Sequence, residues 1–206
     1  MSQALRIFGD LNSGNCLKVL WTARHLGIPF EWTNVDVTLD RSDARGTLRL
    51  EFLALNPAGE VPLVLLPDGR PLAQSNAILR YLSRGTGLLP GDAYAQSKVD
   101  EWLFWEQYSH EPYLAVCRFQ MRFLGVAPSE REAWRVARGE RALDLMEGAL
   151  TTTSFLASGG FSIADVALLP YTRTAPEAGF DLTRRPRVRE WIERCEAELG
   201  LSPDQI

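Results

Sequence analysis

The chain has 206 residues, of which 46% are hydrophobic and 23% charged, and its formal net charge is −4. This composition is typical of a globular protein with a buried core and excludes intrinsic disorder. The acidic balance argues against nucleic acid as a partner, because a phosphate-binding surface needs a surplus of Lys and Arg. No apolar run approaches the ~20 residues that cross a bilayer, and the N-terminus lacks a secretory signal. We therefore expect a cytoplasmic protein without a membrane partner.

The first part of the chain alternates strand-like and helix-like segments. Apolar runs, alternating patterns and turn residues predict strands over residues 5–8, 30–37, 62–66 and 72–73. Helical spacing of apolar residues predicts helices after Ser13, over residues 50–55 and from Ser75. The predicted order is βαβαββα, ending near Gly85 to Gly87.

The second part contains only helical patterns. They predict helices over residues 93–124 with a break at Pro112, over 129–150 with Ser129 as cap, from Ser162, and over 186–199. At the third of these, Ser162 and Asp165 have the spacing of a capping box. A linker-like stretch with Pro90 and Gly91 separates the two parts. We place the domains at residues 1–88 and 89–206.

The sequence lacks the motifs of several common cofactor, nucleotide and metal sites. There is no dinucleotide-binding glycine motif after a strand, no phosphate-binding P-loop and no H-E-x-x-H. The two histidines, His25 and His110, have no second ligand at metal spacing, so we expect no metal. The three cysteines, Cys16, Cys117 and Cys195, are odd in number and widely separated, which fits a reducing compartment.

The segment from Ser13 to Cys16 joins an apolar strand to an amphipathic helix. Free N–H groups at such a helix start, beside the Ser13 hydroxyl, stabilise an anion such as a thiolate. The spacing is that of a redox C-x-x-C with serine in the first place, so disulfide chemistry is disfavoured. The alternative for Ser13 is that it is only an N-cap. Cys16 lies on the apolar stripe of the helix, and we expect it to be a small core residue and not a nucleophile.

Two later segments are suited to a peptide ligand. Pro62 opens a predicted strand and exposes the amide and carbonyl of Val61 at the sheet edge, unless the segment is a simple turn. Ser75, the expected cap of the next helix, offers a hydroxyl and a helix start to a ligand carboxylate. Together these features favour a small peptide that carries a thiol and carboxylates.

The chain resembles a cytosolic glutathione S-transferase over nearly its full length. The motifs that carry the resemblance are Ser13-Gly14-Asn15-Cys16, Asn56-Pro57-Ala58-Gly59-Glu60-Val61-Pro62, Gln74-Ser75-Asn76-Ala77-Ile78 and Ser162-Ile163-Ala164-Asp165. The resemblance implies an N-terminal thioredoxin-like α/β domain, an all-α C-terminal domain and a homodimer. Ser162 and Asp165 match a capping box that serves folding in this family.

The resemblance also implies the roles of site residues. Ser13 matches the serine of theta- and delta-like classes that stabilises the glutathione thiolate, and Phe8 stands where the tyrosine-type alternative would need its tyrosine. Pro62 is expected to be cis, with the backbone of Val61 holding the cysteinyl part of glutathione.

Gln74 and Ser75 match the pair that binds the γ-glutamyl end, although Gln74 replaces the usual acidic residue. Glu60 directly precedes Val61 in the segment that would hold the cysteinyl part of glutathione, and it is acidic where polar or basic residues are common in this family.

The implied activity is glutathione transfer to a small hydrophobic electrophile, with glutathione as co-substrate. The aromatic stretch over residues 102–113 lies on a helix, where such a stripe is alternatively part of the core. Within it we choose Tyr108 as the pocket residue because its hydroxyl gives a polar tip, with His110 and Glu111 as weaker candidates. The alternatives are a glutathione-dependent peroxidase or isomerase, and a non-catalytic ligand-binding or regulatory protein on the same scaffold.

Overall fold

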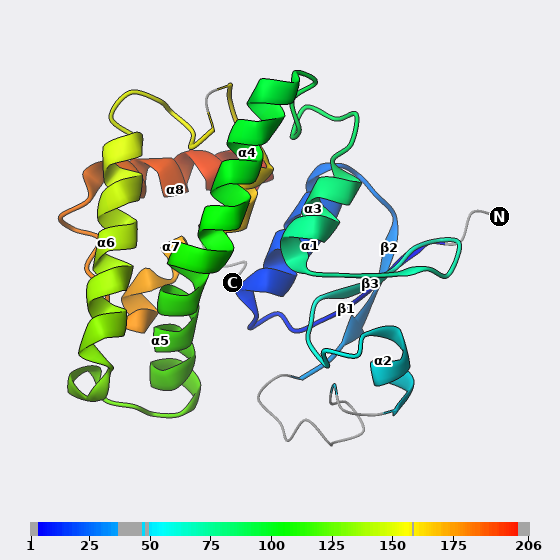
Figure 1. Cartoon of the computed structure of the whole chain (residues 1–206), viewed down its shortest axis with the longest axis horizontal. Helices are drawn as coiled ribbons and strands as arrows, with labels where there is room; N and C mark the ends of the chain where they lie inside the picture. The colour runs from blue at the N-terminus through cyan, green and yellow to red at the C-terminus, as the bar shows by residue number, and fades with distance from the viewer. Residues whose placement is uncertain (1–3, 37–46, 48–49, 158, 202–206) are drawn as a thin grey trace. The chain divides into compact units, whose positions relative to one another are not determined.

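The computed structural model describes residues 4–36, 47, 50–157 and 159–201, which fall into two compact units that divide between Arg84 and Gly85 (Figure 1). The Leu88 carbonyl accepts a hydrogen bond from the Ile163 amide at 3.0 Å, so the segment after Gly85 packs with the helices that follow it. The division therefore lies before the boundary expected after residue 88. No helix in the described part of the chain is long and apolar enough to span a membrane.

The first unit has the predicted βαβαββα order. Its elements are β1 (Leu5–Gly9), α1 (Gly14–His25), β2 (Phe30–Asn34), α2 (Leu50–Leu55), β3 (Leu63–Leu65), β4 (Pro71–Ala73) and α3 (Ser75–Leu82). The strand order in the sheet is β2-β1-β3-β4, with β1 parallel to β2 and β3 antiparallel to both of its neighbours. The strand expected to reach residue 37 ends at Asn34, and residue 37 itself lies outside the described residues.

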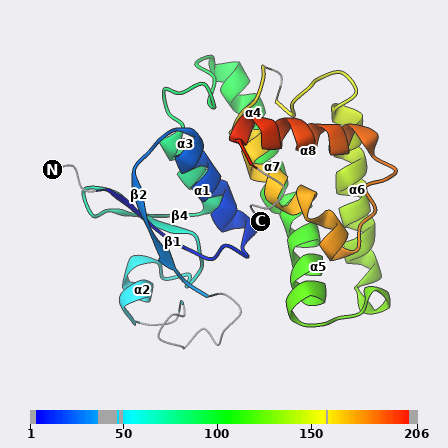
Figure 2. The ribbon, with the colours of Figure 1, turned by 180° about the vertical axis from the view of Figure 1, so that it is seen from behind.

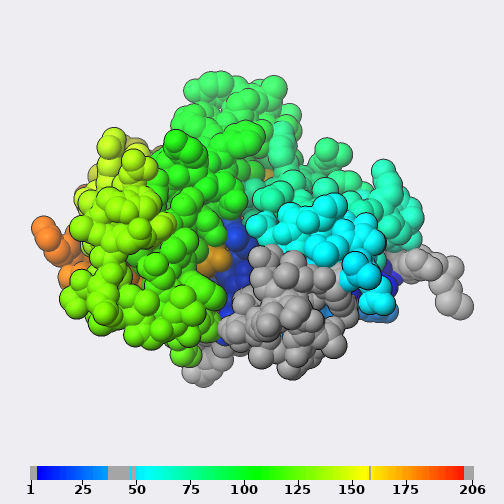
Figure 3. Space-filling model, turned by 60° about the horizontal axis from the view of Figure 1, so that its bottom comes forward, coloured from blue at the N-terminus to red at the C-terminus, as the bar shows by residue number. Residues whose placement is uncertain are grey.

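Successive side chains along each strand point to opposite faces of the sheet, and the two faces pack against different helices. Phe8 and Leu63 are cross-strand partners and share a buried cluster with Phe52 of α2, whose ring meets that of Phe8 edge-on at 6.1 Å between centroids. The neighbouring partners Ile7 and Val64 are fully buried and point to the opposite face. Figures 1 and 2 show α1 and α3 side by side on that face. The outer side of α2 lies at the surface, cyan in Figure 3.

The second unit is helical throughout the part that the structure describes. Its elements are α4 (Ala93–Trp105), a π-helical turn (Glu106–His110), α5 (Glu111–Phe123), a 3₁₀ turn (Pro128–Glu130), α6 (Ala133–Ala149), α7 (Ile163–Arg173), a second 3₁₀ turn (Ala175–Ala178) and α8 (Pro186–Leu199). α7 is buried on every side from Ile163 to Thr172. A helix that is buried all round belongs to the core, so the other helices of this unit pack around α7.

Two predicted helix boundaries differ from those observed. The break expected at Pro112 occurs just before it, at the π-helical turn, because Pro112 sits in the first turn of α5, where a missing N–H is tolerated. The helix expected from Ser129 begins at Ala133, so the prediction of Ser129 as its cap is wrong. The residues around Ser129 instead form a 3₁₀ turn, in which the Glu130 carboxylate accepts a hydrogen bond from the Ala127 amide at 2.9 Å.

The capping box at the start of α7 is confirmed. Ser162 Oγ accepts from the Ala164 amide at 3.2 Å, and Asp165 Oδ2 accepts from the Ser162 amide at 3.0 Å and from its hydroxyl at 3.1 Å. Asp165 Oδ1 accepts from the Leu156 amide at 2.8 Å and from the Trp191 indole at 2.9 Å, which joins α7 to α8. Burial raises the pKa of Asp165 to about 6, and the hydrogen bonds from these donors oppose that rise.

We expect Asp165→Asn to lower the free energy of unfolding by roughly 1–3 kcal/mol, because an amide nitrogen cannot accept the bonds that one carboxylate oxygen now accepts. Asp92→Asn is the matched control: Asp92 caps α4 by accepting from the Ala95 amide at 2.9 Å, and Asn caps a helix about as well as Asp. Denaturant unfolding of both variants measures the difference. An equal change in the two variants would contradict the role given to Asp165.

Candidate active site

Three segments that are distant in sequence leave the four-stranded sheet at the same end of its strands. Phe8 near the end of β1 pairs with Leu63 at the start of β3, and Leu63 pairs with Ala73 at the end of β4. Because β3 is antiparallel to both neighbours, the segment after β1, the segment before β3 and the segment after β4 leave the sheet together. These segments contain the candidate residues Ser13, Glu60, Val61, Gln74 and Ser75.

Ser13 stands at the start of α1 with its hydroxyl unused as a helix cap. Its backbone is extended, with φ −87° and ψ 116°, and its carbonyl accepts from the amides of Cys16 and Leu17 at 3.0 Å. The side chain forms no capping hydrogen bond, so the geometry does not support the alternative in which Ser13 serves only as an N-cap. The first amides of a helix lie outside its hydrogen-bond ladder and carry partial positive charge. The hydroxyl therefore lies where a developing anion is stabilised.

Cys16 follows in the first turn of α1 and is fully buried. Burial raises the pKa of its thiol to about 11, while a side-chain hydrogen bond with Ser13 acts in the opposite direction. A thiol with such a pKa is protonated at neutral pH and is a poor nucleophile. Cys16 is thus a core residue, as expected.

The segment before β3 is a loop folded around the side chain of Asn56. Asn56 is buried, its Nδ2 donates to the Glu60 carbonyl at 2.7 Å, and its Oδ1 accepts from the Ala58 amide at 3.3 Å. The Val61–Pro62 peptide bond is cis, as the resemblance implies. Val61 makes no backbone hydrogen bond to any other described residue. Its amide and carbonyl are therefore available to a ligand.

The position of Val61 in the sheet differs from the one predicted. β3 lies between β1 and β4, so Val61 stands beyond the end of an interior strand, and the prediction that it lies along a free sheet edge is wrong. The reason is that β3 pairs with β1 on one side and with β4 on the other from Leu63 onward. The residues just before Leu63 have no strand partner. A peptide that pairs with Val61 would extend the sheet at this end. The Glu60 side chain, next to it, is exposed.

Gln74 precedes α3 in a left-handed conformation, with φ 68° and ψ 110°, the one non-glycine residue with positive φ among those described. Such a backbone costs of order 1–3 kcal/mol and persists only where the surrounding structure imposes it. The Gln74 carbonyl accepts from the Ile78 amide at 3.0 Å, so Gln74 is the helix cap and the prediction of Ser75 as cap is wrong. Ser75 begins the helix, is buried, and donates its hydroxyl to Asn15 Oδ1 at 3.2 Å.

Asn15 and Lys18 belong to this arrangement, although the sequence analysis did not single them out as site residues. Asn15 Oδ1 also accepts from Lys18 Nζ at 2.7 Å, and Lys18 is fully buried. Their spacing of three residues, which places them on one face of a helix, is the only signal the sequence contains. The bond to Ser75 depends on the packing of α3 against α1.

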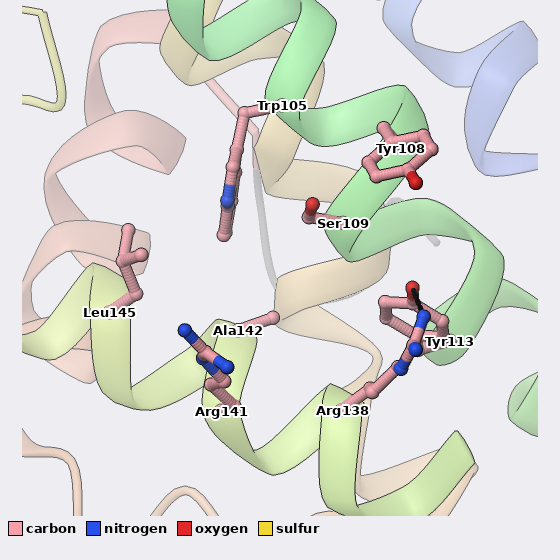
Figure 4. Close-up of a pocket in the computed structure, with 8 residues that line it drawn as sticks. All are labelled: Trp105, Tyr108, Ser109, Tyr113, Arg138, Arg141, Ala142 and Leu145. Carbon is pink, nitrogen blue, oxygen red and sulfur yellow. Dashed lines mark hydrogen bonds between the residues drawn. The ribbon is translucent and has the colours of Figure 1, made fainter. Parts of the chain in front are cut away.

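Within the second unit, Tyr108 lines a pocket of about 300 Å³ between the α4–α5 segment and α6 (Figure 4). Its walls are Trp105, Tyr108, Ser109, Tyr113, Arg138, Arg141, Ala142 and Leu145. Tyr108 is 79% exposed, and Arg138 donates to the Tyr113 hydroxyl at 3.0 Å. His110, the weaker candidate, is fully buried with Nε2 2.9 Å from the Thr172 hydroxyl, so it is part of the helical core.

Comparisons with known proteins identify the family to which the chain is similar. The family described as glutathione S-transferase, N-terminal domain, matches residues 12–84, and the glutathione S-transferase C-terminal domain matches residues 128–194. The chain is similar to glutathione S-transferase 3 of Zea mays, at 33% identity over 94% of this chain and 89% of that protein. It is also similar to glutathione S-transferase theta-1 of Bos taurus, at 32% identity over 95% of this chain and 84% of that protein.

A solved structure extends the likeness to three dimensions. The glutathione S-transferase of Pseudomonas fluorescens has 41% sequence identity and a TM-score of 0.90, with 98% of both chains covered. The thioredoxin-like first unit and the helical second unit are those of these relatives. The chain belongs to the glutathione S-transferase family.

Proposed function

We propose that this protein transfers glutathione to a small hydrophobic electrophile and that Ser13 activates the glutathione thiol. The observation that carries the proposal is the Ser13 hydroxyl, which forms no capping bond and belongs to the segments that leave the sheet at the same end of the strands as Val61 and Ser75. The names of the relatives support glutathione transfer in general. The serine-type assignment itself rests on the resemblance of the Ser13-Gly14-Asn15-Cys16 segment to theta- and delta-like classes.

Activation by Ser13 is a matter of thiol ionisation. A free thiol has a pKa near ~8.5 and is mostly protonated at neutral pH, whereas the thiolate is the nucleophile. A hydrogen bond donated by the Ser13 hydroxyl and the N-terminal end of the α1 dipole both favour the thiolate. A decrease of about two units in the thiol pKa corresponds to about 2.7 kcal/mol between the two protonation states. The glutathione thiol loses its proton to solvent, and Ser13 keeps its own. With an aryl halide, the thiolate forms a C–S bond at the ring carbon as the C–halogen bond breaks and the halide ion leaves.

The tripeptide would be held by groups at this same end of the strands. The amide and carbonyl of Val61 can pair with the cysteinyl backbone as a neighbouring strand would, with Glu60 in the same binding segment. Gln74 and Ser75 would hold the γ-glutamyl end. Glutathione acts here as a co-substrate. No group of three His, Cys, Asp or Glu among the described residues could hold a metal ion, and a metal-free reaction remains our prediction.

We assign the electrophile to the pocket beside Tyr108. Its aromatic wall, with Trp105 and Tyr113, suits an apolar ring, and the Tyr108 hydroxyl suits a polar substituent on that ring. Two further proposals, a homodimer and a cytoplasmic location, rest on the resemblance to the family.

Calorimetric titration with glutathione, followed by a conjugation assay with aryl halides, tests the proposed function. We expect saturable binding and turnover. Absence of binding at millimolar glutathione would overturn the proposal. Binding of glutathione without turnover of any tested substrate would favour the non-catalytic, ligand-binding alternative. Turnover of peroxides alone, or of isomerisation substrates alone, would favour the peroxidase or the isomerase alternative.

We expect Ser13→Ala to lower kcat near neutral pH by roughly 10- to 100-fold, since about two units of thiol pKa are lost, and to change glutathione affinity by less than about threefold. Steady-state kinetics and the ultraviolet absorbance of bound thiolate as a function of pH measure the two effects. Ser13→Thr, which keeps the hydroxyl, is the control and should retain most of the rate. Equal activity of wild type and Ser13→Ala across several electrophiles would eliminate Ser13 as the thiolate stabiliser.

The protein's own thiols should be inert in the folded state. Cys16, Cys117 and Cys195 are buried, and burial raises the pKa of each thiol, that of Cys16 to about 11. We expect a thiol reagent near neutral pH to label the native protein slowly and all three cysteines after unfolding. Rapid labelling of native Cys16 would show that the chain supplies a reactive sulfur of its own, contrary to the proposed mechanism.

A further inference from the structure

The pocket beside Tyr108 has an aromatic side and a cationic side. The α4–α5 segment contributes the rings of Trp105, Tyr108 and Tyr113, and α6 contributes Arg138 and Arg141 (Figure 4). Among the described residues, none that lines this pocket is acidic, although the chain has 26 Asp and Glu against 22 Lys and Arg. The positive charge of the α6 side is therefore not neutralised by another wall of the pocket.

The two arginines differ in how firmly they are held. Arg138 donates to the Tyr113 hydroxyl at 3.0 Å, and its guanidinium lies 5.7 Å from the centroid of the Trp134 ring. Arg141 is exposed and makes no hydrogen bond or ion pair to any residue that the structure describes. Figure 4 shows its side chain extending from α6 toward the space beside Trp105. The donors of the Arg141 guanidinium are thus available to a bound molecule.

The charges of α6 are divided between two sides of the helix. Its carboxylates face the start of α8, where Arg185 Nη2 lies 2.6 Å from both Glu140 Oε2 and Asp144 Oδ1. Arg138 and Arg141 are three positions apart and therefore lie on one face of α6, where like charges destabilise a helix. An anion bound beside them would relieve that repulsion.

An aromatic acid matches both sides of the pocket. Its ring can pack against the aromatic wall, while its carboxylate can accept two parallel hydrogen bonds from a planar guanidinium, a geometry that arginine offers and lysine does not. The pocket volume of about 300 Å³ is at the lower end of the range for small-molecule sites, which fits a single substituted ring.

We infer that the electrophile is a substituted benzene that carries a carboxylate, and that Arg141 is the residue that selects it. This inference rests on the proposed function, which assigns the electrophile to this pocket. The carboxylate takes no part in the bond changes, because the C–S bond forms at another ring carbon, the one from which the halide ion leaves. Arg141 pairs with the carboxylate and thereby determines specificity, and Arg138 adds positive charge to the same wall.

The test compares two electrophiles that differ in charge. One is a chlorodinitrobenzoate and the other the corresponding chlorodinitrobenzamide, with the chlorine opposite the variable group in both. Each kcat/KM is divided by the rate constant of the uncatalysed reaction with glutathione, which removes the difference in intrinsic reactivity. We expect the wild type to favour the carboxylate by roughly tenfold at low salt, near the lower limit for a hydrogen bond to a charged group because Arg141 is exposed.

Variants of Arg141 assign this preference to one side chain. Arg141→Gln should lower the ratio of the two normalised values by about fivefold, since the charge is lost. Arg141→Lys, which keeps the charge without the planar fork, should retain part of the preference. Added salt should lower the wild-type ratio toward that of Arg141→Gln, because it screens an exposed ion pair.

The matched control is Arg189→Gln. Arg189 is an exposed residue of α8 that does not line the pocket, so this variant removes the same charge from the same unit and should keep the wild-type ratio. A general loss of structure lowers the rate with both electrophiles and cancels in the ratio.

The outcomes distinguish the two proposals. Equal ratios in the wild type and Arg141→Gln, or an equal decrease in Arg189→Gln, would overturn the role of Arg141 while leaving glutathione transfer intact. Turnover of other aryl halides but of neither member of this pair would do the same. Absence of glutathione binding by the wild type would instead overturn the proposed function.

Discussion

The antiparallel placement of β3 between β1 and β4 is the constraint on which the candidate site depends. Its register aligns Phe8, Leu63 and Ala73 across three strands. That alignment brings the start of α1, the cis Val61–Pro62 bond and the start of α3 to the same end of the strands. Had β3 run parallel to β1, its first residue would lie at the opposite end, and no backbone group of Val61 could share a ligand with Ser13.

Gly9 permits close packing at the end of β1. A Cβ built on Gly9 would lie 2.6 Å from the Trp32 ring and 3.1 Å from the Cys16 side chain, so a larger residue would force the ring or the helix to shift. The glycine therefore lets Cys16 of α1 approach the strand, where its side chain is fully buried.

The net charge of −4 says little about how such a site would capture an anionic tripeptide. The groups that we propose for glutathione are helix amides, the backbone of Val61 and hydroxyls, which act over a few ångströms. Lys18 is buried and donates to Asn15, the residue whose side-chain oxygen also accepts from Ser75. Local polarity at the two helix starts, and not the overall charge balance, carries the proposed recognition.

The sequence by itself determined what depends on near neighbours along the chain. The order of the elements, the bounds of α2 and α8, the burial of Cys16 and the capping box of Ser162 all follow from apolar spacing and from contacts within about one helical turn. Family resemblance added the cis bond before Pro62.

Only the tertiary structure decided that β3 is an interior strand, that Gln74 replaces Ser75 as the cap of α3, and that Asn15 meets Ser75 across a separation of 60 residues. These features depend on how strands pair and helices pack, and a linear pattern records which residues prefer burial but not which distant partner they meet there.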